Sequence, residues 1–584
     1  MEYNKRIFSK RDAKKQRKFS IIIICIFIFL LLSVSGGYLL FHIYWPNSEM
    51  ASPYEMIEGL REGEVNLMFN SEIIPDHQVL ERDGILFLPK GFVLEYLDPH
   101  IFWDARVNML TITTPDTVIR IYGDNLEYEL NGQIMPLATP VLNIQDAAYL
   151  PVNLLTELYD VELSFLEEYT ILLADSTQIP RTQSNILQDT PMRFAPSIRS
   201  PIAEHLVSGE EIMLLLEESE NENFRKVRTL RGLIGYVDSR YIGEENIIPP
   251  VIRQVVDTKP NHNIDGPIVL LWEQVFSRSA AADPARRVLV PQVNVMSPTW
   301  FSFDAETLNG DIVSIASREY VDWAHANGKQ IWALISDNFD VTVSRAVLDC
   351  SEVRRHVINQ LMEFVEVYNL DGINIDYEAI VPNTARYFIQ FLRELRPPMH
   401  AAGAILSMDA FVPTYTRFWN RTEIAKAVDY VVIMAYDEHW SGSPVSGPVA
   451  SLPFVRRGIV ETMYEVPHDM IILGLPFYVR IWRETQDDEG NISRTIRNFS
   501  MDRAYRMFRD AGAAFEWQDD IGSYYAEFYT VEYGEEIKYR VWLECPRSIE
   551  QKMFLFQEFE LAGIAAWARN LETEEVWNVI GQFL

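Results

Sequence analysis

The sequence predicts an α/β protein whose C-terminal part, residues 262–584, is a (β/α)8 or TIM barrel. Three observations support this fold class. Eight short apolar segments follow one another in this part of the chain, and amphipathic stretches with helical spacing separate them. Strands that alternate with helices favour a parallel sheet. Eight such strands with crossover helices over about 320 residues are typical of a closed barrel.

The predicted strands begin near residues 267 (PIVLLW), 288 (VLVPQVNVM), 329 (KQIWALIS), 371 (DGINIDYE), 403 (GAILSMD), 428 (VDYVVIMAYD), 470 (MIILGLPFY) and 561 (LAGIAAWA). One predicted helix, at 351–368, places Val357, Leu361 and Val365 on a single apolar stripe, as expected for a helix packed outside a sheet. The gap between the seventh and eighth strands is too long for one helix. A small α+β insertion is therefore expected at about 480–550.

The start of the chain differs from the rest in charge and hydropathy. The whole chain has a formal net charge of −32, which argues against a nucleic-acid partner. Residues 1–19 nevertheless hold eight Lys or Arg and only two acidic residues, and an uncharged run follows. We expect a cytoplasmic tail at 1–19, a single-pass membrane anchor at 20–44 and an extracytoplasmic remainder. The alternative is a signal peptide cleaved at "SVSG", which also exports the protein.

Two smaller regions precede the barrel. Residues 67–175 repeat weakly at an offset of 62, with Leu88–Pro89 matching Leu150–Pro151, and each copy predicts a strand, a short helix and a strand. This pattern resembles copper amine oxidase N-terminal-like domains and implies a spacer or a wall-interaction module. The region has no His cluster, so no copper site is expected. Residues 181–245, with "VRTLRGLIGYV", resemble a bacterial Src-homology-3-like domain, whose members often bind wall peptides, and a passive spacer remains the alternative.

Three cysteines are too few for a disulfide framework or a zinc site. Outside the apolar run only Cys350 and Cys545 remain. They could pair, but two separate structural thiols are favoured.

The fourth predicted strand of the barrel carries three polar side chains in alternation. Asn374, Asp376 and Glu378 lie two residues apart and are separated by Ile or Tyr, so they are expected to point into the barrel. A buried carboxylate costs several kcal/mol unless it is paired. Two inward carboxylates about 6–7 Å apart along a strand cannot both ionise cheaply. One is pushed toward its protonated form, as a general acid requires, and Glu378 is the one nearest the mouth, where barrel enzymes place their chemistry.

The segment "DGINIDYE" resembles the Asp-x-x-Asp-x-Asp-x-Glu signature of glycoside hydrolase family 18, with Asp371, Asn374, Asp376 and Glu378 at its four positions. Asn374 departs from the pattern, which has Asp there. "MAYDEHW" at 434–440, "LGLPFY" at 473–478 and the tryptophan of "GIAAWA" resemble further strands of the family. The resemblance is nearest to exported bacterial N-acetylglucosaminidases of peptidoglycan, through "YRVWLECPRSIEQK" at 539–552.

This resemblance implies a retaining mechanism in which the acetamido group of the substrate is the nucleophile. It implies that Glu378 protonates the glycosidic oxygen, that Asp376 holds the acetamide, and that Tyr436 binds the acetamide oxygen. The implied substrate-binding residues are Asn374, Met434, Asp437 and Trp567. Neither a metal nor another cofactor is implied. Because Asn374 removes the usual proton-sharing neighbour of Asp376, the resemblance leaves the pH optimum open.

Each of these residues has a simpler interpretation on its own. A single carboxylate is more often a structural ion-pair partner, and a single tyrosine or tryptophan is more often part of a core. Trp272, Trp300, Trp332 and Trp440 could pack in a core or line the cleft, and His439 is expected to be structural. Their combination on barrel strands favours a carbohydrate site. Three functions remain: an enzyme on peptidoglycan or chitin-like glycans, a sugar-binding wall protein without turnover, and a surface scaffold.

Overall fold

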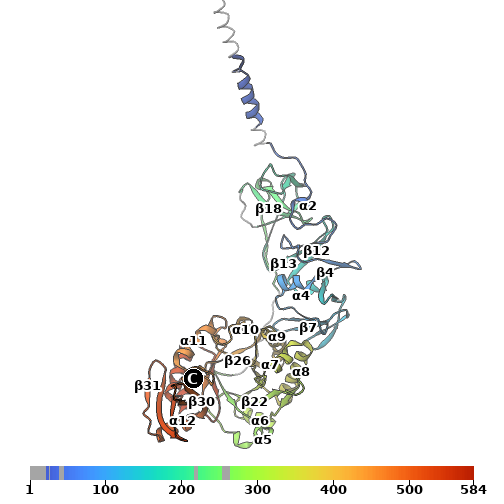
Figure 1. Cartoon of the computed structure of the whole chain (residues 1–584). Coiled ribbons are helices and arrows are strands. Elements are labelled where there is room, and N and C mark those ends of the chain that lie inside the picture. Colours follow the sequence, from blue (N-terminus) through green and yellow to red (C-terminus); the bar gives the residue numbers. More distant parts are fainter. Residues whose placement is uncertain (1–21, 25, 39–44, 216–220, 253–263) are drawn as a thin grey trace, which may run out of the picture. The chain divides into compact units, whose positions relative to one another are not determined.

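The computed structural model describes residues 22–24, 26–38, 45–215, 221–252 and 264–584 (Figure 1). The chain splits into two compact units: Met1–Leu97 with Tyr149–Arg253, and Asp98–Ala148 with Gln254–Leu584. The two units are considered separately.

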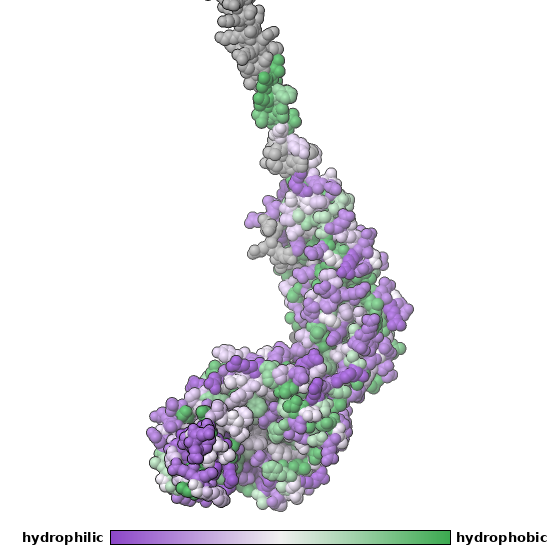
Figure 2. Space-filling model, viewed as in Figure 1, coloured by the Kyte–Doolittle hydropathy of each residue, from purple (hydrophilic) through white to green (hydrophobic). Residues whose placement is uncertain are grey.

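The expected cytoplasmic tail, 1–19, lies outside the described residues. The expected anchor, 20–44, is described only at 22–24 and 26–38, where the chain is helical and its apolar side chains are exposed (Figure 2). In the part of the chain that the structure describes, no helix combines the length and hydropathy that a membrane span needs.

The first unit is built mainly from short strands. Its helices are α2 (Pro53–Met56), α3 (Lys90–Phe92), the π-helix η1 (Val93–Leu97), α4 (Val152–Leu158) and the 3-10 helix η2 (Ser239–Tyr241). Its strands are β1 (Asn66–Phe69), β2 (Glu72–Ile73), β3 (Leu80–Arg82), β4 (Ile85–Pro89), β11 (Ala147–Pro151), β12 (Val161–Leu166), β13 (Ile171–Ser176), β14 (Arg181–Asn185), β15 (Thr190–Arg193), β16 (Ile202–Leu206), β17 (Glu211–Leu214), β18 (Phe224–Thr229), β19 (Ile234–Asp238) and β20 (Asn246–Ile248).

The weak repeat has a structural counterpart in this unit. Strands β4 and β11 pair antiparallel, and Leu88 lies directly opposite Leu150, its partner in the repeat. A short helix follows each of the two strands, as expected. Residues after 181 form a separate seven-stranded sheet in the order β16-β15-β19-β18-β17-β14-β20. The interpretation of 181–245 as a Src-homology-3-like domain stays a prediction.

The second unit contains the predicted barrel. Eight parallel strands form it: β21 (Ile268–Glu273), β22 (Val295–Phe303), β24 (Gln330–Ser336), β25 (Gly372–Asp376), β26 (Ile405–Phe411), β27 (Tyr430–Met434), β28 (Ile471–Pro476) and β34 (Gly563–Trp567). The ring closes because β21 pairs with both β22 and β34. The short β23 (Ile312–Ser314) pairs antiparallel with β22.

Helices surround this ring (Figure 1). They are α5 (Arg278–Ala281), the 3-10 helix η3 (Pro284–Arg286), α6 (Arg318–Ala326), α7 (Val341–Asp349), α8 (Ser351–Tyr368), α9 (Ala385–Ala401), α10 (Arg421–Ala427), α11 (Leu452–Met463), the 3-10 helix η4 (His468–Met470), α13 (Pro546–Glu558) and α14 (Glu574–Ile580). The (β/α)8 prediction is confirmed. The second strand begins at Val295 rather than near 288, because a turn at Pro291 interrupts the apolar run.

Two apolar cores follow from the alternation of side chains along the strands. An inner core fills the ring and includes Leu270, Trp332 and Val432. An outer core lies between strands and helices and includes Val357, Leu361 and Val365, the stripe predicted for the helix at 351–368.

The expected insertion before the last strand is an antiparallel sheet with one helix. Its elements are β29 (Tyr478–Gln486), β30 (Ile492–Ser500), α12 (Met501–Asp510), β31 (Glu516–Gln518), β32 (Ser523–Glu532) and β33 (Glu535–Leu543). The strand order is β30-β29-β33-β32-β31. Helix α12 packs onto the sheet through Phe508, whose ring meets Phe528 edge-to-face at 5.0 Å.

A second small sheet belongs to the same unit as the barrel. Its strands are β5 (Phe102–Asp104), β6 (Met109–Thr113), β7 (Val118–Tyr122), β8 (Glu127–Leu130) and β9 (Gln133–Pro136), and β10 (Leu142–Ile144) follows. Arg120 on β7 binds Glu129 at 3.0 Å and reaches the fully buried Glu394 of α9 at 3.1 Å. Arg354 of α8 binds the same Glu394 at 2.9 Å. Cys350 and Cys545 are both free thiols.

Candidate active site

The carboxyl end of β25 places three polar side chains inside the barrel. Asn374 and Asp376 lie on this strand, and Glu378 follows two residues after its end. The residues between them are buried in the outer core, which fixes the alternation. Asp376 and Glu378 line a pocket at the barrel mouth, and Asn374 lies below them. The structure therefore brings together the three residues that the sequence placed on one face of this strand.

The amide of Asn374 is held by three other strands. Its Oδ1 accepts hydrogen bonds from Trp272 Nε1 at 2.9 Å and Ser297 Oγ at 3.3 Å. Its Nδ2 donates to Asp409 Oδ1 at 2.8 Å and Ser407 Oγ at 3.2 Å. The indole can only donate, so it fixes which end of the amide carries the oxygen. All four hydrogen-bonding positions of Asn374 are filled, and one of its four partners is the carboxyl group of Asp409.

Asp337, just past the end of β24, holds the backbone at Glu378. Its Oδ1 accepts the Glu378 N–H at 3.3 Å, and its Oδ2 accepts the Ala379 N–H at 2.8 Å. Ser344 of α7 donates a third hydrogen bond to Oδ2 at 2.6 Å. Asp337 is fully buried, so its carboxylate lies in a low-dielectric environment beside the predicted acid.

Glu378 has the pKa of a general acid at neutral pH. Burial, followed by the negative charges of Asp337 and Asp437, raises the pKa of Glu378 to about 7, whereas a hydrogen bond with Asp376 opposes the shift. An ordinary glutamate has a pKa near 4.3 and would hold almost no proton at pH 7. The environment at the mouth thus supplies the proton that acid catalysis needs.

The pKa of Asp376 is also raised. Burial, followed by the charges of Asp409, Glu378 and Asp337, raises the pKa of Asp376 well above its usual range. Its Oδ1 is buried and has no hydrogen-bond partner among the residues that the structure describes. An unpaired buried carboxyl oxygen is energetically costly, and a ligand N–H that reached it would remove that cost.

The end of β27 supplies Met434, Tyr436 and Asp437. Tyr436 is buried, and its ring meets Tyr478 edge-to-face at 6.2 Å; burial first, and then nearby acidic groups, raise the pKa of the Tyr436 phenol well above its usual value. The phenol is therefore a neutral donor. Asp437 is half-exposed and adopts a left-handed backbone (φ 58°), and its carboxylate binds Arg480 at 2.7 Å and accepts the Tyr478 hydroxyl.

These groups meet in one pocket of about 340 Å³. It is lined by Trp272, Gln274, Phe339, Asp376, Glu378, Asp409, Phe411, Met434, Tyr436, Asp437, Tyr478, Arg480, Asn498, Phe499, Trp567 and Leu571. Trp567 ends β34 and meets Trp272 edge-to-face at 5.8 Å, and the Trp567–Ala568 peptide is cis. The pocket holds both aromatic surface and carboxyl groups, the combination that sugar rings and their polar substituents require.

The remaining candidates lie elsewhere. Trp300 is buried in the outer core and Trp332 in the inner core, whereas Trp440 is 55% exposed. His439 Nδ1 lies 3.1 Å from the carbonyl oxygen of Pro448.

Four residues of the site were not predicted from the sequence. Asp337 follows the end of β24 and supports Glu378, Asp409 lies on β26, and Tyr478 and Arg480 lie on the first strand of the insertion. One signal was available. In "ILSMDAF" Ser407 and Asp409 alternate with apolar residues, as Asn374 and Asp376 do.

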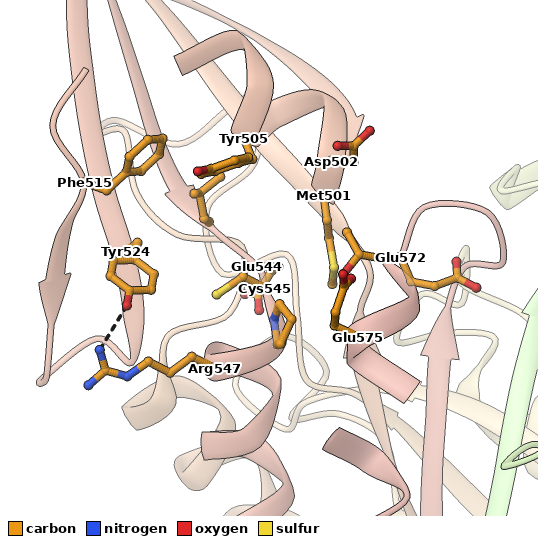
Figure 3. A pocket seen from close by; sticks show the side chains of 13 residues that line it. Met501, Asp502, Tyr505, Phe515, Tyr524, Glu544, Cys545, Arg547, Glu572 and Glu575 are labelled. Carbon is orange, nitrogen blue, oxygen red and sulfur yellow. Dashed lines mark hydrogen bonds between the residues drawn. The ribbon is translucent and has the colours of Figure 1, made fainter. Parts of the chain in front are cut away.

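A larger pocket, of about 890 Å³, lies between the insertion, the start of α13 and the loop after β34 (Figure 3). Figure 3 shows the rings of Tyr505, Phe515 and Tyr524 along it, with Arg547 bound to the Tyr524 hydroxyl. Its buried carboxylate, Glu544, is neutralised by Lys552 at 2.8 Å. None of the predicted site residues lines this pocket, and an ion-paired carboxylate cannot serve as a proton donor. The smaller pocket is the candidate active site.

Residues 300–572 match the glycosyl hydrolases family 18 model, and residues 68–171 match the copper amine oxidase N-terminal domain model. The first match runs from within β22 to beyond the end of β34 and includes Asp376, Glu378 and Tyr436. The second covers the weak repeat. Both families were expected from the sequence, and both resemblances are confirmed.

Two relatives come from Bacillus subtilis. The putative sporulation-specific glycosylase YdhD is 30% identical over 244 residues, covering 41% of this chain and 56% of that protein. The cortical fragment-lytic enzyme is 26% identical over 292 residues, covering 48% of this chain and 66% of that protein. The C-terminal domain of a putative chitinase from Desulfitobacterium hafniense aligns in structure with a TM-score of 0.47 and 19% identity, over 55% of this chain and all of that domain. The chain thus spans little more than half the length of YdhD.

Proposed function

Residues 300–572 form a domain of glycosyl hydrolases family 18, and from this premise we propose that the chain is a glycosidase that cleaves β-1,4 bonds of N-acetylglucosamine-containing glycans with retention of configuration. The single observation that supports this most strongly is Glu378, placed at the barrel mouth with a pKa of about 7. A sugar-binding protein without turnover has no need for a proton held there.

The pocket has the groups that substrate-assisted catalysis needs. Glu378 donates its proton to the glycosidic oxygen and afterwards takes a proton from the incoming water. The unpaired Oδ1 of Asp376 accepts the N–H of the substrate acetamide, which turns the acetamide oxygen toward the anomeric carbon. The neutral Tyr436 phenol donates a hydrogen bond to the same acetamide group, and Trp567 stacks on the sugar ring.

The substrate class that we propose is peptidoglycan rather than chitin. The relatives with 30% and 26% identity are named a sporulation-specific glycosylase and a cortical fragment-lytic enzyme. The basic residues of 1–19, followed by an apolar run, support a membrane anchor with the barrel outside the cytoplasm. A wall polymer would be within reach of such a protein.

The test is hydrolysis by the full chain in detergent. Purified peptidoglycan and chitin are incubated separately with the wild type and with Glu378→Gln, and new reducing ends are identified by mass spectrometry. We expect N-acetylglucosamine ends from peptidoglycan with the wild type and none above background with Glu378→Gln. Cleavage of chitin alone would contradict peptidoglycan as the substrate but would still support the proposed glycosidase reaction. Binding without any cleavage would establish the alternative, an inactive wall-binding protein.

A further inference from the structure

Asp409 on β26 is a buried carboxyl group to which the expected mechanism gives no role. It lies inside the barrel with 2% of its surface exposed and lines the pocket. The register of β25 and β26 pairs Asn374 with Ser407 and Ile375 with Met408, so the next positions outward are Asp376 and Asp409. Both side chains point inward, because the inward side chains of Asn374 and Ser407 touch at 3.2 Å one pleat below.

Asp409 is therefore a lateral neighbour of Asp376. Adjacent strands lie about 4.8 Å apart, whereas positions i and i+2 of one strand are about 6.6 Å apart. A carboxyl group at 409 lies at least as near to Asp376 as one at position 374 would. After burial, the charge of Asp409 is the largest cause that raises the pKa of Asp376.

We infer that Asp409 supplies the carboxyl group that position 374 lacks, and that Asp376 and Asp409 share one proton in the resting enzyme. The inference rests on the proposed function for its catalytic consequence and on the geometry of β25 and β26 for the pairing itself. Two adjacent buried carboxyl groups hold one proton between them because both cannot ionise cheaply.

The shared proton moves between the two carboxyl groups during the reaction. When the acetamide attacks the anomeric carbon, positive charge develops beside Asp376. The proton then moves from the carboxyl oxygen of Asp376 to that of Asp409, which leaves Asp376 anionic and Asp409 neutral. No proton leaves the site, and the acid proton on Glu378 is not involved.

The same arrangement explains why position 374 is an asparagine and not an aspartate. Its Nδ2 donates to Asp409 Oδ1 at 2.8 Å, so this position requires a donor while Asp409 is charged. An aspartate there would add a third carboxyl group to the pair and would lack that N–H. Among the described residues, the titratable groups that face Asp409 are Asp376 of β25, Glu378 just after β25 and Tyr436 after β27, and all of them are acidic. Asn374 and Asp409 therefore form one unit.

The test compares Asp409→Asn, Asn374→Asp and the double variant that exchanges the two groups. Asp409→Asn should lower kcat about 10- to 100-fold, because Asp376 loses the group that takes its proton. It should also move the acidic limb of the pH–rate profile, because the pair takes up its second proton with a pKa that differs from the pKa of Asp376 alone. Asn374→Asp alone should move that limb to higher pH.

The double variant distinguishes a role of Asp409 in proton sharing from a purely structural role. In Asn374→Asp/Asp409→Asn a carboxyl group again lies beside Asp376, so kcat should recover at least tenfold relative to Asp409→Asn. Asp429→Asn is the matched control: it removes a buried carboxylate at the start of β27, away from the mouth, and should leave the acidic limb unmoved. A thermal melting curve of each variant checks that it is folded.

Infrared titration tests the pairing without turnover. At neutral pH the wild type should show the carbonyl band of a protonated carboxyl group that Asp409→Asn lacks. An unchanged band, an unmoved acidic limb, or a double variant no better than Asp409→Asn would overturn the inference. If the wild type cleaves no glycan, the proposed function fails, and the infrared band still decides whether the two carboxyl groups share a proton.

Discussion

The carboxylate of Asp337 accepts the backbone N–H groups of both Glu378 and Ala379, at 3.3 and 2.8 Å. A residue just past the end of one barrel strand thus fixes the position of the acid that follows the next strand. Asp337 has two effects on Glu378: it holds the backbone in place, and its charge raises the pKa of the Glu378 carboxyl group.

The first prediction concerns Asp337→Asn. The amide keeps the volume and one acceptor oxygen but removes the charge, so the pKa of Glu378 should fall. Glu378 must be protonated to act, so activity is lost as pH rises through its pKa. The basic limb of kcat/KM should move to lower pH, and kcat should fall about tenfold or more as the backbone loosens. A basic limb that stays in place would show that Asp337 does not influence the acid.

The second prediction is a shift of the basic limb in the opposite direction, toward higher pH. Arg480 pairs with Asp437 at 2.7 Å, and the charge of Asp437 raises the pKa of Glu378. Arg480→Gln removes the counter-charge, so Asp437 should act more strongly and the basic limb should move to higher pH. The pH–rate profile of Arg480→Gln measured beside that of Asp337→Asn checks both signs. Shifts in the same direction would contradict this electrostatic account.

The third prediction concerns the wild type. With a Glu378 pKa of about 7, kcat/KM should fall tenfold for each pH unit above neutrality, with the midpoint of the basic limb near pH 7. The measurement is kcat/KM for a soluble peptidoglycan oligomer from pH 4 to pH 9. A midpoint below about pH 5 would mean that Glu378 behaves as an ordinary exposed glutamate.

The fourth prediction concerns stability. Glu394 is fully buried between Arg354 and Arg120, and these two cations lower its pKa although burial opposes the shift. Glu394→Gln leaves Arg354 without an anionic partner among the described residues and leaves Arg120 with Glu129 alone, and it should cost about 3 kcal/mol of unfolding free energy at neutral pH.

The pH dependence of that cost follows from the lowered pKa. A carboxylate with a lowered folded-state pKa stabilises the fold above its unfolded pKa, near 4.3, and that contribution is lost as the pH falls through the folded value. The melting temperatures of wild type and Glu394→Gln should therefore converge in acid. A difference that stays constant from pH 7 to pH 3 would contradict the ion-pair account.

The sequence predicts the elements of this fold well where the signal is local. Eight apolar segments and a stripe such as Val357, Leu361 and Val365 depend only on spacing along the chain, and the structure confirms the barrel and the insertion. The beginning of the second strand was missed because an apolar run continues across Pro291, where the chain turns.

The candidate site was predictable only along single strands. Asn374, Asp376 and Glu378 share one strand, so a period of two reveals their common face. The contacts of Asp409 and Asp337 with that face depend on which strands are neighbours in the ring and in which register. Arg480 comes from an insertion whose position over the mouth no local pattern encodes.

The central claim is that Glu378 donates the proton to the leaving group. The most direct measurement compares wild type and Glu378→Gln on a soluble peptidoglycan oligomer and on an aryl glycoside of the same oligomer, whose leaving group needs no proton. We predict that kcat/KM of Glu378→Gln falls about 100-fold or more on the oligomer and much less on the aryl glycoside. Equal losses on the two substrates, or no loss on either, would contradict the account.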